Sequence, residues 1–432
     1  MWRLAWPLVL AELGWMAQGT VDLIMAGPLG PAAIGAGSLG NMLFYTVAVF
    51  GTGLLLGMDT LVAQSFGAAD RLDCRKTLVN GIWLGIGLTL PLAIVIRALI
   101  PLMRITGTNP RVLAQFGPYI QALTWSLLPL LLYTAFRRYL QSVNIVKPVT
   151  LALIGANLVN LLGDWVLMYG HWGAPRMGLE GSGWSTTIAR VYMAAMLGGT
   201  IIWHERAVRE SVSRWPDVAR LRRLVMLGLP AAAQIAIELA VFATVTALAG
   251  KLDETSLAAH SIAVNVVSVT FMVPLGISSA AAVRVGQAFG RRDLDGLVLS
   301  GWTAVAFSAL FMGGSGLALG FVPQWIVRIF SSDAAVIASG AVLLRIAALF
   351  QLFDGFQVVT TGALRGLGDT RTPMLAHFIG YWAIGLPVGY ALCFHFDWGV
   401  RGIWVGLSTA LILIGLCLIL VWRARVREFQ FL

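Results

Sequence analysis

Long apolar segments separated by short polar ones repeat along the whole chain. Twelve stretches of about twenty or more mostly apolar residues occur, and about twenty residues is the length that an α-helix needs to cross a bilayer. The pattern therefore predicts an all-α integral membrane protein with twelve transmembrane helices. The predicted spans are residues 4–26, 32–64, 77–102, 114–137, 147–170, 178–203, 224–249, 255–288, 297–323, 334–362, 372–396 and 399–422.

The first seventy residues or so recur about 223 positions later without a gap. Pro7 falls on Pro230, and the segment 64–67 falls on 287–290. Chance similarity between apolar stretches would mostly pair Leu, Val and Ala, whereas here Pro, Gly and Gln recur at matching points. The repeat predicts two similar lobes, and in membrane transporters a substrate site commonly lies between such halves.

The spans divide the chain into three parts. Residues 1–203 and residues 224–432 each hold six predicted spans, and residues 204–223 form the longest polar segment. Because six is an even number, both lobes enter the membrane in the same direction, which makes a parallel repeat. We expect residues 204–223 to be a cytoplasmic linker. Two interpretations stay open for it, an amphipathic helix on the membrane surface and a solvated basic loop that only fixes topology.

Lys and Arg gather in alternate loops and so indicate the orientation. The loops rich in them are predicted to be cytoplasmic, which places both termini inside. The opposite loops hold fewer and more scattered basic residues. The residues that mark the cytoplasmic side are Arg71, Arg75, Lys76, Arg137, Arg138, Lys147, Arg206, Arg209, Arg214, Arg220, Arg222, Arg223, Arg291, Arg292, Arg365, Arg371, Arg423, Arg425 and Arg427.

Composition supports a membrane location. Apolar residues make up 58% of the chain and charged residues 12%, whereas about a quarter of the residues in soluble domains are charged. The net charge of +10 is spread over short runs between apolar segments, so it gives no reason to expect nucleic acid as a partner. We expect the lipid bilayer to surround most of the chain.

Asp22, Asp164, Glu238 and Asp354 are the clearest acidic residues inside predicted spans, where an ionisable side chain is costly and by default marks a function. In the first lobe Asp22 shares a helix face with Gln18. Asn157, Asn160 and Asp164 follow i, i+3, i+7 spacing, which places them in one polar stripe on the fifth span. At 1.5 Å per residue, Asp22 and Asp164 reach similar depths. A shared ion or proton site is therefore expected in this lobe.

The second lobe carries its own polar set. Glu238 shares a helix face with Gln234, and Asp354 lies three residues from both Gln351 and Gln357. Carboxylates and carboxamides are hard oxygen ligands that suit Na⁺, and a desolvated carboxylate can instead take up a proton. Both ions stay open, and so does the interpretation that the polar groups only tie helices together.

Three further charged residues lie in or near the spans. Arg190 is near the middle of the sixth span, and because a buried charge needs a partner it is expected to pair with Asp164 or Asp22. The alternative is that its long side chain reaches toward water. Glu12 and Asp59 are weaker candidates, since Glu12 has no evident partner and Asp59 lies close enough to the inner interface to be hydrated.

Several segments resemble the multidrug and toxic compound extrusion (MATE) family, and more its bacterial NorM-type members than the plant or animal ones. They are Thr20-Val21-Asp22 with Met25-Ala26-Gly27, the segment 64–67 with its repeat at 287–290, and the run 362–373. The run 362–373 is the most specific of them, and the resemblance covers nearly the whole chain.

The resemblance implies two six-helix lobes around a V-shaped central cavity that opens alternately to each side of a bacterial cytoplasmic membrane. It implies an ion or proton site at Asp22, Asn160 and Asp164, and a cation site at Glu238 and Asp354. This chain keeps both sets, so the choice between Na⁺ and H⁺ stays open. Arg190 has no counterpart in the family pattern.

The leading hypothesis is a monomeric secondary transporter that exports small organic cations, many of them aromatic drugs, in exchange for Na⁺ or H⁺. The alternative is a flippase for a lipid-linked anionic precursor, which shares this architecture and should line its cavity with Arg or Lys. An enzyme is not expected, because the chain has no HExxH or GxSxG motif and no clustered histidines. We expect no cofactor besides the coupling ion.

Overall fold

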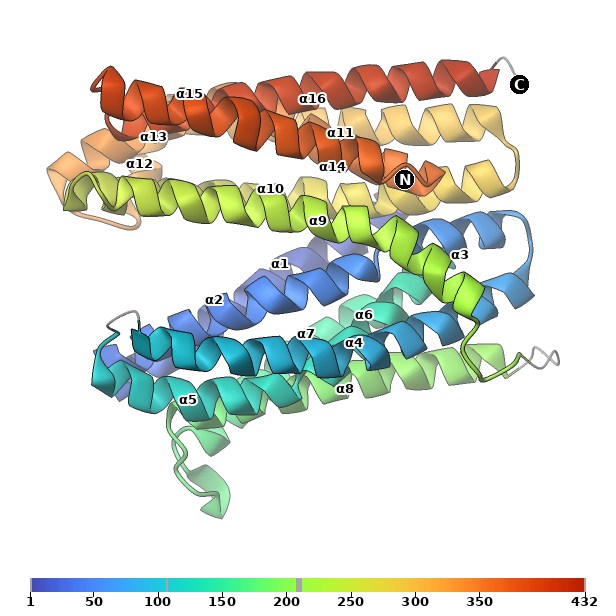
Figure 1. Ribbon diagram of the computed structural model, residues 1–432, viewed down its shortest axis with the longest axis horizontal. Helices are drawn as coiled ribbons and strands as arrows, with labels where there is room; N and C mark the ends of the chain where they lie inside the picture. The colour runs from blue at the N-terminus through green and yellow to red at the C-terminus, as the bar shows by residue number, and fades with distance from the viewer. Residues whose placement is uncertain (1, 106–107, 207–211, 431–432) are drawn as a thin grey trace. The chain divides into compact units, whose positions relative to one another are not determined.

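A computed structural model describes residues 2–105, 108–206 and 212–430, and Figure 1 shows the course of the chain. The described residues contain helices and no strands. The main helices are α1 (Trp2–Ala26), α2 (Pro31–Leu54), α3 (Gly57–Gly67), α4 (Arg71–Ile105), α5 (Pro110–Trp125), α6 (Leu127–Ser142), α7 (Lys147–Leu167), α8 (Leu179–Glu205), α9 (Val218–Ala249), α10 (Glu254–Gly290), α11 (Leu294–Phe321), α12 (Pro323–Arg328), α13 (Ala334–Leu367), α14 (Arg371–His377), α15 (Leu386–Tyr390) and α16 (Val400–Gln430).

Four short elements complete the chain. Two are 3₁₀ turns, η1 (Gly27–Leu29) and η2 (His171–Gly173), and two are π-helical, η3 (Phe378–Gly385) and η4 (Ala391–His395). The π-helical elements are continuous with α14 and α15, so together they make one span from Arg371 to His395. Wide π turns are rare and often lie at functional sites.

All twelve predicted spans coincide with helices. Among the described residues, ten helical segments are long and apolar enough to cross a membrane, and an eleventh is the pair α5 and α6, which bends by 41° at Ser126. The predicted sixth span corresponds to α8, which has 27 residues but is more polar than the others because it carries Arg190 and several Ser and Thr side chains. The prediction of an all-helical membrane fold is confirmed.

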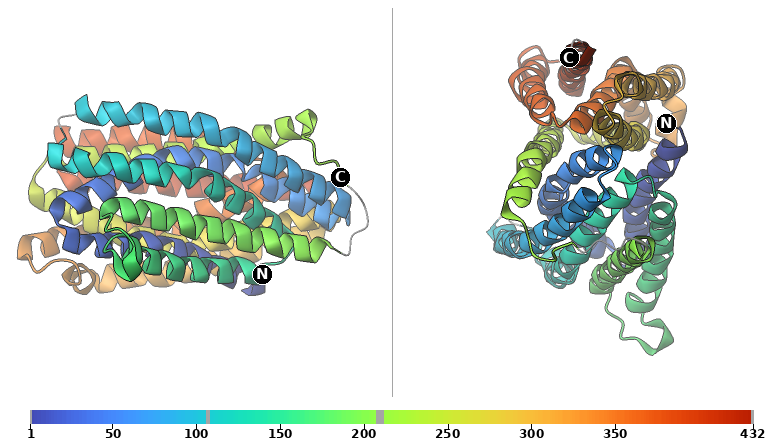
Figure 2. Two further views of the ribbon diagram at one scale, coloured as in Figure 1. Left: turned by 90° about the horizontal axis from the view of Figure 1, so that it is seen from below. Right: turned by 90° about the vertical axis from the view of Figure 1, so that its right-hand side faces the viewer.

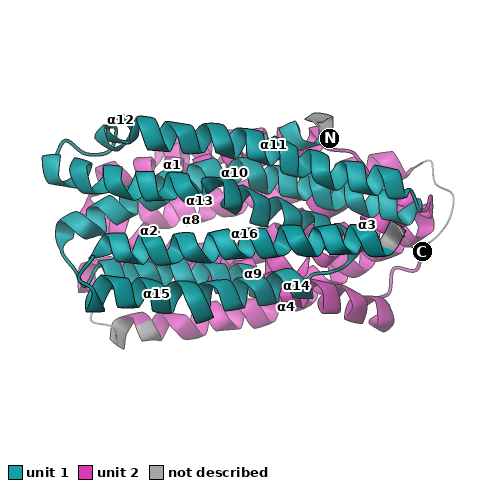
Figure 3. Cartoon of the chain, turned by 90° about the horizontal axis from the view of Figure 1, so that it is seen from above, with its two compact units in different colours: residues 1–9, 233–432 teal, residues 10–232 magenta. Residues whose placement is uncertain are grey.

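The chain forms two compact units, coloured separately in Figure 3. One unit is Leu10–Ala232, here called the N-unit, and the other is Met1–Val9 with Ala233–Leu432, here called the C-unit. These boundaries differ from the predicted ones at residues 203 and 224. The difference arises because α1 and α9 each continue without a break across a boundary, so a division based on polar loops misses it.

Figure 2 shows the helices in two further views. Small residues let the helices of each unit approach closely. In the N-unit, a Cβ added at Gly181 of α8 would lie 2.6 Å from the backbone of Leu167 in α7. In the C-unit, the corresponding approach is between Gly362 of α13 and Ser278 of α10. Apolar side chains from the surrounding helices fill a separate core in each unit.

The internal repeat is visible in the packing of the two units. In the N-unit, Gly53 packs against Ala232, and a Cβ on Gly53 would lie 2.6 Å from the Ala232 Cα. In the C-unit, Gly276 packs against Val9, where the equivalent distance is 2.7 Å. Val9 and Ala232 are 223 positions apart, as are Gly53 and Gly276. The offset found in the sequence therefore relates two equivalent contacts, one inside each unit.

The described part of the predicted linker is helical only at its two ends, where it belongs to α8 and α9. Helix α8 ends at Glu205, residues 212–217 are not helical, and α9 begins at Val218. Residues 207–211, which include the predicted cytoplasmic Arg209, lie outside the described residues. Trp83 of α4 donates a hydrogen bond from its indole N–H to the Arg214 carbonyl oxygen at 2.8 Å. The non-helical stretch is thus attached to α4.

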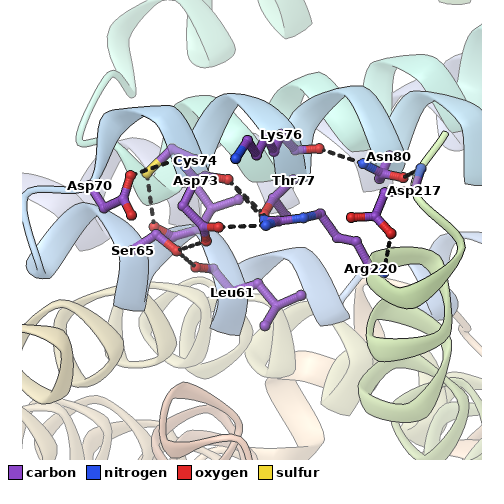
Figure 4. Close-up of polar contacts among 11 residues, drawn as sticks. Leu61, Ser65, Asp70, Asp73, Cys74, Lys76, Thr77, Asn80, Asp217 and Arg220 are labelled. Carbon is purple, nitrogen blue, oxygen red and sulfur yellow. Dashed lines mark hydrogen bonds and ion pairs between the residues drawn. The ribbon is translucent and has the colours of Figure 1, made fainter. Parts of the chain in front are cut away.

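A polar cluster at the start of α4 holds the beginning of α9 (Figure 4). Arg220 donates to the carboxylate of Asp73 at 2.5 Å and to the hydroxyl of Thr77 at 2.9 Å. The backbone N–H of Asp217 donates to the side-chain oxygen of Asn80 at 2.8 Å. Because these bonds join α4 to the first turns of α9, they explain why those turns belong to the N-unit.

We predict that Arg220→Ala destabilises the N-unit by about 1–2 kcal/mol, because it removes a partly exposed ion pair and two charge-assisted hydrogen bonds. Thermal unfolding in detergent, followed by tryptophan fluorescence, measures this change. Arg222→Ala is the matched control, since Arg222 is exposed two residues further along the same helix. An equal loss of stability in both variants would contradict the role assigned to the cluster.

Asp253 precedes α10 in the C-unit and caps its first turn. Its carboxylate accepts hydrogen bonds from the Ser256 hydroxyl at 2.7 Å and from the Ser256 backbone N–H at 2.8 Å. These hydrogen bonds hold the pKa of the Asp253 carboxyl group below its usual value. An ionised cap satisfies the free N–H groups of the helix start and complements the helix dipole.

Candidate functional site

Three helices of the N-unit bring the first predicted polar set together. α1 supplies Asp22, α7 supplies Asn160 and Asp164, and α8 lies against both with its Ser and Thr side chains. Asp164 and Asn160 are fully buried and Asp22 is 8% exposed. The carboxyl groups of Asp22 and Asp164 lie next to each other, and Asn160 is also beside Asp22. The structure therefore places Asp22, Asn160 and Asp164 in one cluster.

This cluster has more hydrogen-bond acceptors than donors. The Thr186 hydroxyl donates to Asp22 at 3.5 Å, and the Ser185 hydroxyl donates to the backbone carbonyl oxygen of Asn160 at 2.6 Å. Neither carboxylate oxygen of Asp164 receives a hydrogen bond from the described residues, and neither does Oδ1 of Asp22. Two adjacent carboxylates without donors repel each other. A proton or a small cation between them would relieve that repulsion.

A small cavity opens onto this cluster. It has a volume of about 100 Å³ and is lined by Asp22, Ser38, Asn41, Tyr119 and Ser182 among others. The Tyr119 hydroxyl donates to the side-chain oxygen of Asn41 at 2.9 Å. A space of this size holds an ion with a few water molecules.

The two remaining residues of the predicted first-lobe set have different surroundings. The side-chain amide of Asn157 donates to the Gly14 carbonyl oxygen at 3.2 Å, which ties α7 to α1. Gln18 is 7% exposed, and its amide nitrogen has no hydrogen-bond acceptor among the described residues. Asn157 thus acts as a helix tie, whereas Gln18 keeps a free donor one turn from Asp22.

Arg190 does not form the predicted ion pair. It is 1% exposed, so it does not reach toward water either, and it makes no ion pair with a described carboxylate. Its guanidinium donates to the hydroxyls of Ser126 and Tyr45, and its carbon Cζ lies 4.7 Å from the centre of the Phe44 ring. The bend between α5 and α6 places Ser126 there. Aromatic faces and hydroxyls thus take the place of a carboxylate partner.

The surroundings predicted for Glu12 and Asp59 were wrong. Glu12 does have a partner, because Arg137 of α6 forms an ion pair with it. Asp59 is 1% exposed and pairs with Arg138 at 3.3 Å, so it is buried rather than hydrated. The sequence places these pairs 125 and 79 residues apart, and only the packing of α6 on α1 and α3 joins them.

In the C-unit, α13 and α14 bring a second polar chain together. Gln357 donates to the Asp354 carboxylate at 3.0 Å, and the Gln357 carbonyl oxygen contacts the Nε2 atom of His377. The other ring nitrogen of His377 lies 2.7 Å from the Pro373 carbonyl oxygen. Gln234 of α9 approaches the same Nε2 atom at 3.4 Å. Asp354, Gln357 and Gln234 therefore meet around one buried histidine.

Glu238 lies on α9 near Asp354. It is half-buried, and the hydroxyl of Tyr381 in η3 lies near its carboxyl group. Glu238 and Asp354 both line a cavity of about 360 Å³ inside the C-unit. The π-helical turn η3 is thus the element that brings Tyr381 to this site.

Gln351 is not part of this group. Its amide donates to the hydroxyls of Thr270 at 2.6 Å and Ser315 at 3.0 Å, which ties α13 to α10 and α11. Gln351 thus joins helices, as Asn157 does, and the supporting role predicted for both residues in ion binding stays a prediction.

Sequence reasoning missed Tyr381, His377 and Thr186. His377 carried a usable signal, because an ionisable residue in an apolar span marks a function by default. Tyr381 and Thr186 carried none, since a tyrosine or threonine in a membrane helix is common. Their roles follow from the helices that pack beside them.

Oxygen atoms dominate both clusters, which suits Na⁺ or a proton rather than a transition metal. No group of three or more His, Cys, Asp and Glu side chains that could hold a metal ion occurs among the described residues. The carboxylates, the hydroxyls and the Asn160 and Gln357 carboxamides are the groups available to either ion.

The MatE family profile matches residues 7–166 and 230–391, one segment in each half of the repeat. The chain belongs to the MatE family. A relative named probable multidrug resistance protein NorM, from Mesorhizobium japonicum, is 37% identical to this MatE chain over 437 residues, covering 98% of this chain and 93% of the relative. The multidrug resistance protein NorM of Burkholderia vietnamiensis is 36% identical, covering 98% and 93%.

Solved structures share the MatE fold. The crystal structure of a MATE transporter in complex with MaL6 superposes with a TM-score of 0.91 at 17% identity, covering all of this chain and 96% of the other. The eukaryotic MATE transporter AtDTX14 superposes with a TM-score of 0.88 at 18% identity, covering 99% and 97%. The resemblance found in the sequence is thereby confirmed, and this MatE chain is a multi-pass membrane protein.

Proposed function

We propose that this protein is a cation-coupled multidrug antiporter that exports organic, mainly cationic and aromatic compounds in exchange for Na⁺ or H⁺. The observation that carries the proposal is the pair of buried acid clusters, Asp22 with Asp164 and Glu238 with Asp354, one inside each unit. Relatives that are named multidrug resistance proteins and match over almost the whole chain support it. A bacterial inner membrane, cytoplasmic termini and a monomeric state belong to the same proposal.

The mechanism follows from differential binding of the coupling ion. Adjacent carboxylates with few hydrogen-bond donors favour any state of the protein in which a cation is bound between them. Binding from one side of the membrane shifts the population toward one arrangement of the lobes, and release on the other side shifts it back. The drug is carried outward while the lobes return to their first arrangement, so the drug and the ion are exchanged across the membrane.

A flippase for an anionic lipid-linked precursor receives less support. Such a protein should present Arg or Lys to its ligand, but no Lys or Arg is among the described residues that line the 360 Å³ cavity. Arg137 is buried and Arg138 is half-buried, and each is paired with an acid. The ionisable side chains that line this cavity are both acidic.

Ethidium efflux from proteoliposomes tests the proposal, with a Na⁺ gradient and a pH gradient imposed separately. We expect an inward gradient of at least one ion to drive efflux by about tenfold or more over the gradient-free rate. The matched control is a variant that combines Asp22→Asn, Asp164→Asn, Glu238→Gln and Asp354→Asn. Efflux that ignores both gradients, or that persists in the combined variant, would show that the protein is not such an antiporter.

A further inference from the structure

Arg190 carries a buried positive charge near the middle of α8. It is 1% exposed, and it makes no ion pair with a described carboxylate. Its guanidinium donates to the hydroxyls of Ser126 and Tyr45, and the centres of the Phe44 and Trp15 rings lie 4.7 Å and 5.9 Å from its carbon Cζ. An arginine keeps its charge in proteins, and a buried charge without a counter-charge is costly. A residue retained at such a cost calls for a function.

Two cavities lie inside the N-unit. The first, here called the Asp22 cavity, has a volume of about 100 Å³ and is lined by Asp22 and, at the start of α8, by Leu179. The second, here called the Arg137 cavity, has a volume of about 150 Å³ and is lined by Arg137 of α6 among others. Two residues further along α6, the Tyr139 hydroxyl donates to Glu205 at 2.7 Å. The Arg137 cavity therefore lies toward the end of α8 that is opposite to Leu179.

Arg190 lies between these two cavities. Helices α1 and α2 and the bent pair α5 and α6 each pass both cavities. In each of these segments, the residue that contacts Arg190 comes between a residue of the Asp22 cavity and a residue of the Arg137 cavity. In that order, with the Arg190 contact in the middle, the residues are Asp22, Trp15 and Glu12 in α1, Asn41, Phe44 and Thr52 in α2, and Tyr119, Ser126 and Tyr133 in α5 and α6. Since a helix advances by about 1.5 Å per residue, the guanidinium lies at a level between the cavities.

The positive charge of Arg190 lies close to the acid cluster. Arg190 follows Thr186 by four residues, so the two share a face of α8 at a rise of about 6 Å. The Thr186 hydroxyl donates to Asp22 at 3.5 Å. Like charges repel strongly at such distances where little water screens them. A cation that moved from Asp22 to the Arg137 cavity would have to come still closer to the guanidinium.

We propose that Arg190 is a selectivity residue that prevents the coupling cation from passing through the N-unit between the Asp22 cavity and the Arg137 cavity. Its charge repels cations, as an arginine does in pores that exclude them, and the rings around it offer no oxygen ligand to Na⁺. The inference rests on the proposed antiport function and adds a barrier against ion leak. An ion that crossed without moving the lobes would dissipate its gradient without exporting a drug.

Ion entry into proteoliposomes in the absence of any drug tests the barrier. A trapped pH-sensitive dye reports H⁺ entry under a pH gradient, and radioactive Na⁺ reports Na⁺ entry under a Na⁺ gradient. We expect Arg190→Gln to raise the entry of at least one of these ions about tenfold or more over the unaltered full-length protein, because the repulsion is lost. Arg190→Lys keeps the charge and should leak less than Arg190→Gln. The matched control is Arg97→Gln, since Arg97 is an exposed arginine on α4 of the same unit, and it should not leak.

A second pair of variants cancels the charge and leaves the arginine in place. Ser126→Asp brings a carboxylate to the position whose hydroxyl now accepts a hydrogen bond from Arg190, so it should neutralise the guanidinium and cause a leak like that of Arg190→Gln. Ser126→Asn adds a group of nearly the same shape without charge and should stay tight. This pair tests the barrier even where Arg190→Gln does not fold, and thermal unfolding establishes which variants are folded.

The outcomes separate this inference from the proposed function. If folded Arg190→Gln or Ser126→Asp is as tight as the unaltered protein, the barrier is wrong even when gradient-driven efflux of ethidium persists. An equal leak in Arg190→Lys and Arg190→Gln, or in Ser126→Asn and Ser126→Asp, would show that the charge is not responsible and would also overturn the inference. If the unaltered protein shows no gradient-driven efflux, it is the proposed function that fails, whereas the leak is measured without a drug.

Discussion

Asp164→Asn is expected to lower the gradient-driven efflux of ethidium by about tenfold or more while the protein remains folded. Asparagine has nearly the shape of aspartate, and its amide can donate to the adjacent Asp22, which removes the repulsion between the two carboxylates. The cluster then no longer needs a proton or cation to be stable. Since the coupling depends on that need, the ion loses its influence on the N-unit. Efflux from proteoliposomes under separate Na⁺ and pH gradients measures the loss.

Asp333→Asn is the matched control for this substitution. Asp333 precedes α13 and accepts hydrogen bonds from the backbone N–H groups of Ala335 and Val336. Asparagine caps a helix about as well as aspartate does, so the same chemical change outside the clusters should leave efflux unaffected. The role of Asp164 would be refuted by equal efflux in the two variants, provided that both reach the same amount in the vesicles.

Gly362→Ala is expected to destabilise the C-unit by about 3 kcal/mol, near the upper end of the cost of overpacking. A Cβ at this position would overlap the backbone carbonyl of Ser278 on α10. Backbone atoms of a helix cannot rotate away as a side chain can, so α10 and α13 would have to separate. For a unit of this size we expect the midpoint of thermal unfolding to fall by about 5–10 °C.

Gly313→Ala is the control for the same substitution in the same unit. Gly313 lies within α11, and no atom is within 4 Å of the position that a Cβ would take. Alanine favours a helix over glycine by about 0.5–1 kcal/mol, so stability should stay equal or rise slightly. A similar fall in both variants would show that the loss comes from the helix itself and not from the contact with α10.

The clusters show which parts of the site were predictable. The acids and Asn160 could be found because charge and amide groups are costly in lipid and so stand out in an apolar span. Asn157 and Gln351 look the same in the sequence, yet their amides donate hydrogen bonds that tie helices together. Spacing along a helix fixes the face on which a residue lies, but it does not reveal which neighbouring helix covers that face.

Arg190 illustrates the same limit. The sequence showed a cation that needed a partner, and the nearby acids were the obvious choice. In the structure the bend at Ser126 and the rings of α2 surround the guanidinium instead. A bend of 41° between α5 and α6 depends on contacts among several helices, so the sequence of α8 contains no sign of it.

By itself the sequence determined the helical membrane fold, the positions of the spans, the parallel repeat and the identity of the four acids. These features follow from local properties, namely apolar length, the 223-residue offset and the cost of charge in lipid. Only the tertiary structure decided where the units divide within α1 and α9, which polar residues meet, and which cluster lies beside the larger cavity. Those features depend on contacts between residues far apart in the chain, and a repeating apolar pattern does not specify such contacts.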